Sequence, residues 1–300
     1  MVFSKIKKMN ISDVIFDIIV YGLCILIFIV IAYPCYFIVI ASVSNANLVA
    51  TGQVTLYPKG FSLYGYKQIF QDGRIWIGYK NTIIYTVLGT LVNLLFTLPA
   101  AYALSRKEFS ARRVIMLFFV FTMFFNGGLI PTYLLIKQLH LIDTMWVFII
   151  PFCVNVFNLI ITRTFFEESI PKELYEAASL DGCSHFQFFG KIVLPLSKPI
   201  IAVMALYYMV GHWNDFFTAL IYIKSDNLKP LQIILRDILL VNQVFAEGAG
   251  LGGNAGGYAQ QYADAVKYGV IIVSTVPILL FYPFIQKYFE KGVMIGSLKG

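Results

Sequence analysis

Long apolar runs, separated by polar connections, dominate the pattern of the chain. Six of these runs contain about 20 or more mostly apolar residues, which is the length that a helix needs to cross a bilayer. They cover residues 14–43, 76–104, 114–136, 145–166, 199–223 and 266–289. The pattern therefore predicts an all-α integral membrane protein, in which a six-span domain at 14–289 lies between a short N-terminus (1–13) and a C-terminal tail (290–300).

The composition supports a membrane protein and excludes other classes. Hydrophobic residues make up 59% of the chain and charged residues only 13%, whereas soluble domains carry about 25% charged residues. The four cysteines show no CxxC spacing and no cluster with histidine, so no metal site is indicated. The formal charge of +7 reports first on membrane orientation in such a protein, and it does not indicate nucleic-acid binding.

The positions of lysine and arginine predict which ends face the cytoplasm. The short connection 105–113 alone carries four basic residues, and short basic connections stay on the cytoplasmic side. This orientation places both termini and the connection 167–198 in the cytoplasm. The segments 44–75 and 224–265 then become the long loops on the outer face.

The inward connection 167–198 is too long for a turn and too polar for a span. A helix should begin with Ser169 as its N-cap and run to about Leu180, because Gly182 then supplies the left-handed position that ends a helix. A second short helix, 184–189, should end at the next glycine. The connection therefore predicts a helix–turn–helix along the cytoplasmic surface.

The first of these two helices has a face of small residues. Ala177, Ala178 and Ser179 would allow another backbone to approach closely, and the acidic residues Glu173 and Glu176 flank them. From these residues alone, two interpretations remain open. The helix is either a docking element for a cytoplasmic partner or an ordinary amphipathic connector.

One motif in this connection resembles a known family. The spacing over 176–195 agrees at every defined position with the EAA loop of ABC importer permeases. The residues that carry the match are Glu176, Ala177, Ala178, Gly182, Ile192, Leu194 and Pro195. The chain resembles a permease of the binding-protein-dependent carbohydrate importers, with a maltose-importer-like fold. The segment from Asn126 to Pro131, with the sequence Asn-Gly-Gly-Leu-Ile-Pro, is similar to the branch for complex oligosaccharides such as pectin fragments.

The resemblance implies a division of labour between subunits. In such permeases the EAA helix inserts into a groove on a separate ATPase. By analogy Glu176 would pair with a basic residue there, Ala177 and Ala178 would let the helix seat deeply, and Asp181 and Gly182 would form the turn.

The expected partners are a second EAA-type permease, two copies of the ATPase, and an extracellular solute-binding protein that delivers a carbohydrate. ATP and magnesium would bind to the ATPase, because this chain has no P-loop motif. We therefore expect a multi-pass, non-catalytic subunit without a cofactor, surrounded by lipid in a bacterial plasma membrane.

Polar residues within the apolar runs are candidates for a substrate path. Ionisable or polar groups at membrane depth are costly and often functional, which draws attention to Asn126, Asn158, Trp213, Asn214 and Asp215. Trp213 could stack on a sugar ring and Asn214 could bond hydroxyls. The alternatives are a polar clamp between helices and, for Asn126, a kink or the end of a span.

The segment 248–253 literally matches GxGxxG, but no parallel strand precedes it, so dinucleotide binding is not expected. Gly250, Gly253 and Tyr258 suit a flexible outer loop. The resemblance suggests that this loop contacts the solute-binding protein, and a plain connecting loop is the alternative.

Three other functions remain as alternatives. Asp215 and His212 could form the ion site of a secondary transporter, which would leave the EAA helix without a role. An intramembrane enzyme is disfavoured, because no HExxH or GxSxG motif is present. The third alternative is an ABC permease for a solute other than a sugar.

Overall fold

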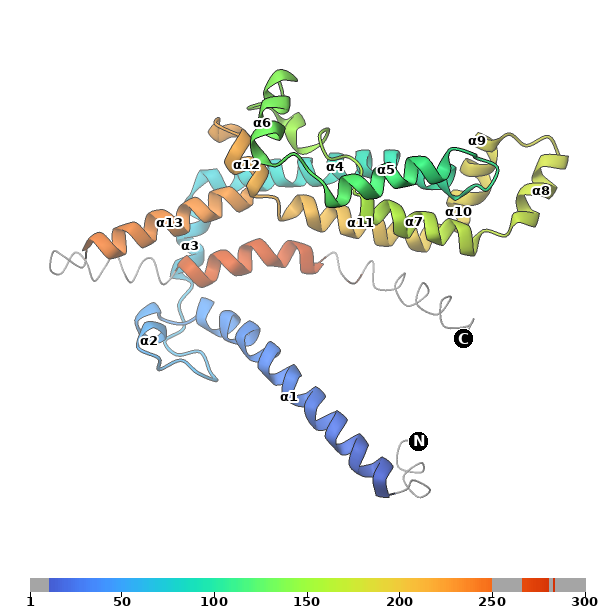
Figure 1. The fold of residues 1–300 in the computed structure, drawn as a ribbon. Helices are drawn as coiled ribbons and strands as arrows, with labels where there is room; N and C mark the ends of the chain where they lie inside the picture. The colour runs from blue at the N-terminus through green and yellow to red at the C-terminus, as the bar shows by residue number, and fades with distance from the viewer. Residues whose placement is uncertain (1–10, 250–265, 281–282, 284–300) are drawn as a thin grey trace. The chain divides into compact units, whose positions relative to one another are not determined.

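The computed structural model describes residues 11–249, 266–280 and 283, and every regular element in these ranges is a helix (Figure 1). In chain order the α-helices are α1 (Ile11–Ser42), α2 (Ala46–Ala50), α3 (Tyr64–Gln71), α4 (Gly73–Ser105), α5 (Arg112–Phe124), α6 (Leu129–Gln138), α7 (Val156–Ser169), α8 (Lys172–Leu180), α9 (His185–Phe188), α10 (Leu194–Leu196), α11 (Lys198–Trp213), α12 (Phe217–Tyr222) and α13 (Leu231–Ala249). Shorter 3-10 helices are η2 (Met145–Phe148) and η4 (Asp226–Leu228), and η3 (Phe189–Val193) is a π-helix. A further apolar helix covers Val266–Leu280.

The described residues fall into two compact units. The first comprises Met1–Gln71 and Leu239–Val273, and the second comprises Asp72–Ile238 and the chain from Ser274 onward. In the first unit, the end of α1 packs on the segment that follows it through a small core of Ile40, Ala41, Val49 and Val54. The long apolar stretch of α1 before this core is exposed. It is long enough to cross a membrane, so we expect lipid or another chain to cover it.

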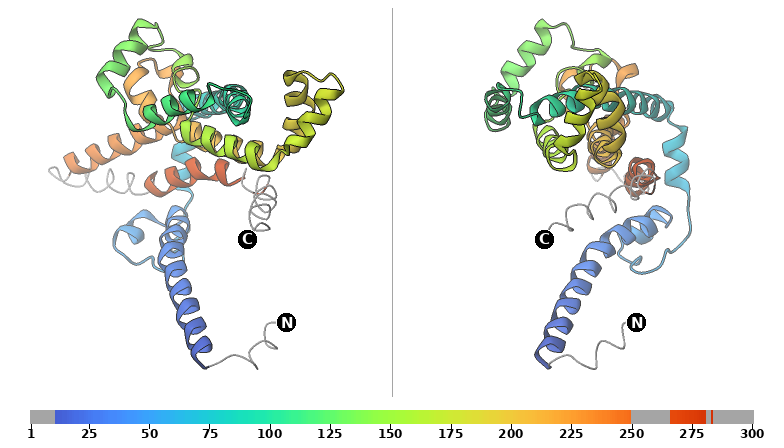
Figure 2. Two further views of the ribbon diagram at one scale, coloured as in Figure 1. Left: turned by 45° about the vertical axis from the view of Figure 1, so that its right-hand side comes forward. Right: turned by 90° about the vertical axis from the view of Figure 1, so that its right-hand side faces the viewer.

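The second unit is built around α4, with α7 and α11 packed along it (Figure 2). Its core includes Ala101 and Leu159, which are fully buried, and Met204 from α11. Small and hydroxyl side chains, including Thr82, Thr86 and Thr97, are buried on the packed side of α4. Small residues let helix backbones approach closely where the surrounding lipid provides no hydrophobic drive for association.

Two polar bridges join α4 to α11 and to the residues that precede α7. His212 Nε2 donates to Asn93 Oδ1 at 2.6 Å, and Asn93 Nδ2 donates to the carbonyl of Cys153 at 2.8 Å. One helical turn away, Thr97 Oγ1 and the hydroxyl of Tyr208 are 2.7 Å apart. These bonds satisfy polar groups that would be costly inside a membrane.

The close approach at the first bridge requires a glycine. A Cβ atom on Gly89 would overlap Cε1 and Nε2 of the His212 ring and lie 2.8 Å from Cδ2. Because only a hydrogen occupies this position, the imidazole fits against α4 and reaches Asn93, which is 2% exposed. The bond between His212 and Asn93 therefore depends both on the register of α4 against α11 and on the glycine at position 89.

Three of the predicted spans contain breaks. The third divides into α5 and α6, which are bent by 115°, and the break lies at the Asn126–Gly128 segment that the sequence singled out. The fourth begins as η2 and becomes α-helical only at Val156. The fifth was expected to run continuously to residue 223, and this is wrong, because α11 ends at Trp213 and α12 begins at Phe217.

Among the residues that the structure describes, two helices, Val14–Ser42 and Gly73–Ser105, are individually long and apolar enough to cross a membrane, and the number rises to four if each bent pair forms one span. The count of six spans therefore stays a prediction. The outer segment 224–265 was expected to be a loop, but it contains the 19-residue helix α13. In its first turns Leu231, Ile234 and Leu235 are buried, so apolar periodicity gives this segment a helical face to pack.

Candidate functional site

The candidate docking helix α8 closely follows the sequence expectation. It covers Lys172–Leu180, with Glu173 in its first turn, and Gly182 follows in a left-handed conformation at φ 76°. The expected cap is wrong in one detail. Pro171 occupies the N-cap position, whereas Ser169 is the last residue of α7. The fixed φ of proline suits the start of a helix, and it lets α7 and α8 follow each other closely.

The second short helix begins as predicted and ends differently. Ser184 caps α9 in a reciprocal capping box with Gln187. The helical conformation does not end at Gly190. It continues through η3 and α10 to a bend of 82° before α11. Phe188 and Val193 are fully buried on either side of Gly190, and this packing outweighs the weak helix propensity of glycine.

An exposed face of α8 and α9 points away from the core of the second unit. Glu173, Glu176 and Ala177 are exposed, and Leu180 and Phe186 are each 90% exposed. The figures place α8 at one end of the unit, beyond α7 and α9 (Figure 1). Glu173, Glu176 and Leu180 recur at the spacing of one helical face of α8, and together they form an exposed surface suited to a basic, partly apolar partner.

The opposite face of α8 is anchored by aromatic packing. The ring of Tyr175 stacks on His185 with centroids 4.9 Å apart and meets Phe188 edge-on at 5.2 Å. Ala178 is partly buried against the same core, so Ala177 and Ala178 face different surroundings. Asp181 and Gly182 are both exposed at the turn between α8 and α9.

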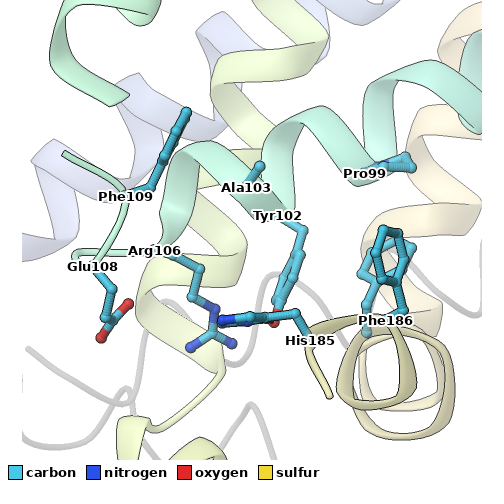
Figure 3. Close-up of a pocket in the computed structure, with 9 residues that line it drawn as sticks. Pro99, Tyr102, Ala103, Arg106, Glu108, Phe109, His185 and Phe186 are labelled. Carbon is cyan, nitrogen blue, oxygen red and sulfur yellow. Dashed lines mark hydrogen bonds between the residues drawn. The ribbon is translucent and has the colours of Figure 1, made fainter. Parts of the chain in front are cut away.

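A single arginine connects this packing to α4. The guanidinium of Arg106 lies over the rings of Tyr102, Tyr175 and Phe188, at 4.8, 5.2 and 5.1 Å from their centroids. Figure 3 shows Arg106, Tyr102 and His185 converging on one another. We call these five residues the Arg106 cluster. Each cation–π contact contributes about 0.5–2 kcal/mol, so the cluster fixes α8 and α9 to the end of α4.

Ion pairs reinforce the same end of the unit. Arg163 of α7 donates to the carbonyl of Leu104 at 3.1 Å and pairs with Glu167 at 2.7 Å. Arg112, at the start of α5, lies 3.5 Å from the same carboxylate. The ends of α4, α5 and α7 are therefore held together beside the candidate docking helix.

The residues expected on a substrate path lie on different elements, with Trp213, Asn214 and Asp215 adjacent in the chain. Asn126 Oδ1 accepts the N–H of Gly128 at the break between α5 and α6, and Asn158 is buried in α7. Trp213 is 4% exposed, and its indole N–H donates to the carbonyl of Ser274 at 2.9 Å. The Trp213 contact joins two helices as a structural clamp does, while the role of each residue toward a substrate stays a prediction.

The break after α11 uses the two polar residues that follow Trp213. Asn214 Nδ2 donates to the carbonyl of Val210 at 3.0 Å, and Asp215 Oδ1 accepts the N–H of Thr218 at 3.0 Å. Asp215 lies one residue before the N-cap Phe216 and accepts a backbone N–H of the first turn of α12, which is a common use of aspartate near a helix start. His212, its proposed partner in an ion site, directs its Nε2 to Asn93 instead.

Two further sets of residues complete the comparison with the sequence. Gly250, Gly253 and Tyr258 lie outside the described residues. Within the described ranges, no group of three or more histidine, cysteine, aspartate or glutamate side chains could hold a metal ion. The Arg106 cluster was missed, although Arg106 was counted as an orientation signal, because nothing local in the sequence links it to Tyr175.

Comparison with known proteins agrees with this geometry. A family model described as "binding-protein-dependent transport system inner membrane component" matches residues 75–295. Protein LplC of Bacillus subtilis (strain 168) is 42% identical over 267 residues, which cover 89% of each chain. The polygalacturonan/rhamnogalacturonan transport system permease protein YtcP of the same organism is 39% identical over 289 residues, covering 95% of this chain and 99% of that protein.

A solved structure is also similar. It is the crystal structure of a bacterial ABC transporter involved in the import of the acidic polysaccharide alginate. The match has a TM-score of 0.81 and 33% sequence identity, and it covers 94% of this chain and 99% of the other. Fold and sequence therefore point to the same group of proteins.

Proposed function

Because the chain belongs to the family of binding-protein-dependent transport system inner membrane components, we propose that it is a permease subunit of an ABC importer for a complex oligosaccharide. The observation that carries the proposal is the exposed α8, with Glu176 and Ala177 on its outer face and a left-handed Gly182 behind it. This helix is the surface on which a separate ATPase docks. The chain itself supplies no catalytic group.

The Arg106 cluster supports a mechanical role for this helix. An ATPase that moves α8 by a few ångströms also moves Tyr175, and Tyr175 contacts Arg106 at the end of α4. Since α4 packs along both α7 and α11, the displacement reaches the helices that carry the polar bridges. ATP-driven closure of the partner then favours one arrangement of these helices over another, which is what alternating access requires.

The remaining parts of the proposed assembly follow from the family. The chain crosses the bacterial plasma membrane six times with both termini in the cytoplasm, and its membrane domain extends over 14–289. A second EAA-type permease completes the path, two ATPase subunits hold ATP and magnesium, and an extracellular binding protein delivers the sugar. The segment with Gly250, Gly253 and Tyr258 faces that binding protein.

Fragments of acidic polysaccharides are the first substrates to test. One relative is named for polygalacturonan and rhamnogalacturonan, and the similar solved structure belongs to an importer of alginate. Asn126, Asn158, Trp213, Asn214 and Asp215 are the side chains of this chain that we assign to the path, with the partner permease supplying the rest.

The docking role is tested by charge reversal on α8. Glu176→Lys should abolish co-purification of the ATPase in mild detergent and reduce uptake of the oligosaccharide by at least tenfold. Glu168→Lys is the matched control, because Glu168 is also an exposed carboxylate but lies on α7. Gly182→Pro tests the turn. If the ATPase stays bound to the Glu176→Lys and Gly182→Pro variants and uptake is unchanged, the proposed coupling is wrong.

A further inference from the structure

A cavity of about 500 Å³ lies beside the Arg106 cluster (Figure 3). It is formed by the last two turns of α4, the connection after it, and α9. Its lining residues are Pro99, Tyr102, Ala103, Arg106, Glu108, Phe109, His185, Phe186 and Phe189. The volume falls in the range of sites that bind small molecules, and the polar bridges do not use it. The cavity shares Phe186 with the exposed face of α8 and α9.

Most of the cavity wall is apolar and lies at the end of a membrane-length helix. Pro99, Ala103 and Arg106 follow one another on a single face of α4, at the spacing of three and four residues. Ala103 is exposed, and Phe186 is 90% exposed. From Pro99 to Ser105 the helix rises by about 9 Å, so in the orientation proposed above the wall would extend from the cytoplasmic interface toward the hydrocarbon.

The cavity has a cationic group at one side. Arg106 forms no ion pair with a carboxylate in the part of the chain that the structure describes, and its Nε, which is buried, has no hydrogen-bond partner there. Aromatic faces hold the guanidinium without neutralising its charge, since they accept no proton and carry no net charge. An anionic oxygen of a ligand would accept hydrogen bonds from the guanidinium and balance its charge.

Glu108 narrows the choice of anion. Its exposed carboxylate lies in the same lining, and it disfavours a ligand that carries more than one negative charge. A phosphodiester carries one negative charge, and free phosphate carries more near neutral pH. An apolar wall, a single cation and a nearby carboxylate together fit a molecule with an acyl chain and a phosphodiester head.

We propose that this cavity holds one glycerophospholipid of the cytoplasmic leaflet, with its phosphodiester at Arg106 and an acyl chain along Ala103 and Phe189. The proposal rests on the orientation proposed above, which places this end of α4 at the cytoplasmic surface. Basic pockets at that surface are suited to phospholipid head groups. A lipid in this position touches both α4 and α9, so it supports the link between the membrane helices and the docking helix.

The test counts phospholipid molecules that stay bound to the whole importer. The complex is purified in mild detergent, delipidated stepwise, and analysed by native mass spectrometry. The wild-type complex should retain one phospholipid per copy of this chain after the others have left. Ala103→Phe, which fills the cavity, should reduce this occupancy at least tenfold. Leu95→Phe is the matched control, because Leu95 is exposed on the same helix but outside the lining.

Arg106 is tested through the head group. Arg106→Gln should weaken retention about fivefold, as expected for one basic residue near a membrane surface, and Arg106→Lys should weaken it less. Reconstitution with phosphatidylethanolamine, phosphatidylglycerol or added inorganic phosphate distinguishes the sources of the phosphate. Competition by inorganic phosphate alone would show an anion site without a lipid and would overturn the proposal.

A photo-crosslinking residue at Phe109 provides a readout that does not depend on the cavity-filling variant. Crosslinking to a phospholipid supports the proposal. Crosslinking to the ATPase or to the second permease means that a protein partner fills the cavity, and the lipid assignment is then wrong. Equal lipid retention by wild type and a folded Ala103→Phe complex would overturn it as well.

Discussion

Replacing Gly89 by alanine should displace His212 from its position against α4. The new Cβ atom overlaps two atoms of the imidazole, and the ring cannot move away while its Nε2 stays bonded to Asn93 at 2.6 Å. Inserting a methyl group into a tightly packed site costs about 1–3 kcal/mol. Loss of one hydrogen bond between membrane helices adds about 0.6 kcal/mol.

The difference in helix propensity between alanine and glycine partly offsets this loss of stability. Alanine is a better helix former than glycine by about 1 kcal/mol, so the net destabilisation should be about 0.5–2.5 kcal/mol. For a unit of this size that corresponds to a fall in Tm on the order of 1–10 °C. The fall in Tm is measured by thermal unfolding of the purified importer, with intrinsic tryptophan fluorescence, to which Trp213 contributes, as the readout.

A matched control and a second variant separate the clash from a general effect. Gly211→Ala changes a glycine of α11 with open space around it, so it should leave Tm unchanged or raise it. In a His212→Ala background, Gly89→Ala should add no further loss, because the ring that it strikes is gone. The reasoning is refuted if Gly89→Ala and Gly211→Ala shift Tm equally, or if the two losses simply add.

Three further predictions concern the anchors of the docking region and the loops. Tyr175→Ala should increase amide exchange in α8 and lower ATP-driven uptake, whereas Tyr175→Phe, which keeps the ring packing, should change uptake less than twofold. Arg163→Met should destabilise the unit by about 1–2 kcal/mol in thermal unfolding, since it leaves Glu167 without its closest cation, while Arg163→Lys should recover part of the loss. Asp143 accepts hydrogen bonds from the Ser225 hydroxyl and, with smaller effect, from backbone N–H groups, and these bonds lower the pKa of its carboxyl from the usual 3.8. The stabilisation is therefore full above about pH 4 and is lost as the pH falls through the lowered pKa. Amide exchange at residue 225 should rise only in that acid range, and Asp143→Asn should remove the pH dependence.

The exact extent of the helices shows where local signals are reliable. Gly182 after the last turn led to the correct end of α8 at Leu180, because a left-handed glycine acts through neighbouring backbone atoms. The start was predicted two residues early, with Ser169 in place of Pro171 as the N-cap. Gly190 carries a similar local signal, yet no helix ends there. Buried Phe188 and Val193 keep the chain helical through this position, and a packing contribution of that kind cannot be read from the glycine itself.

In the candidate site, too, the residues within one short segment could be found from the sequence, whereas their contacts with distant residues could not. The motif from Glu176 to Gly182 could be found from spacing, since all of its members lie within one short helix and its turn. Trp213 and Asp215 were singled out because they carry polar groups within an apolar run. Their contacts with Ser274 and Thr218 depend on where the helix breaks, and apolar composition continues across that break without a signal.

The sequence by itself determined that this is an all-helical membrane protein with a short helix near residues 172–180, because membrane length, apolar composition, caps and glycines act within about 20 residues of chain. Only the tertiary structure decided that Arg106 meets Tyr175 and that His212 lies against Gly89. Each of these pairs joins two different helices across a long stretch of chain. Which side chains meet there depends on the register and bending of packed helices, and a pattern along one helix does not contain that information.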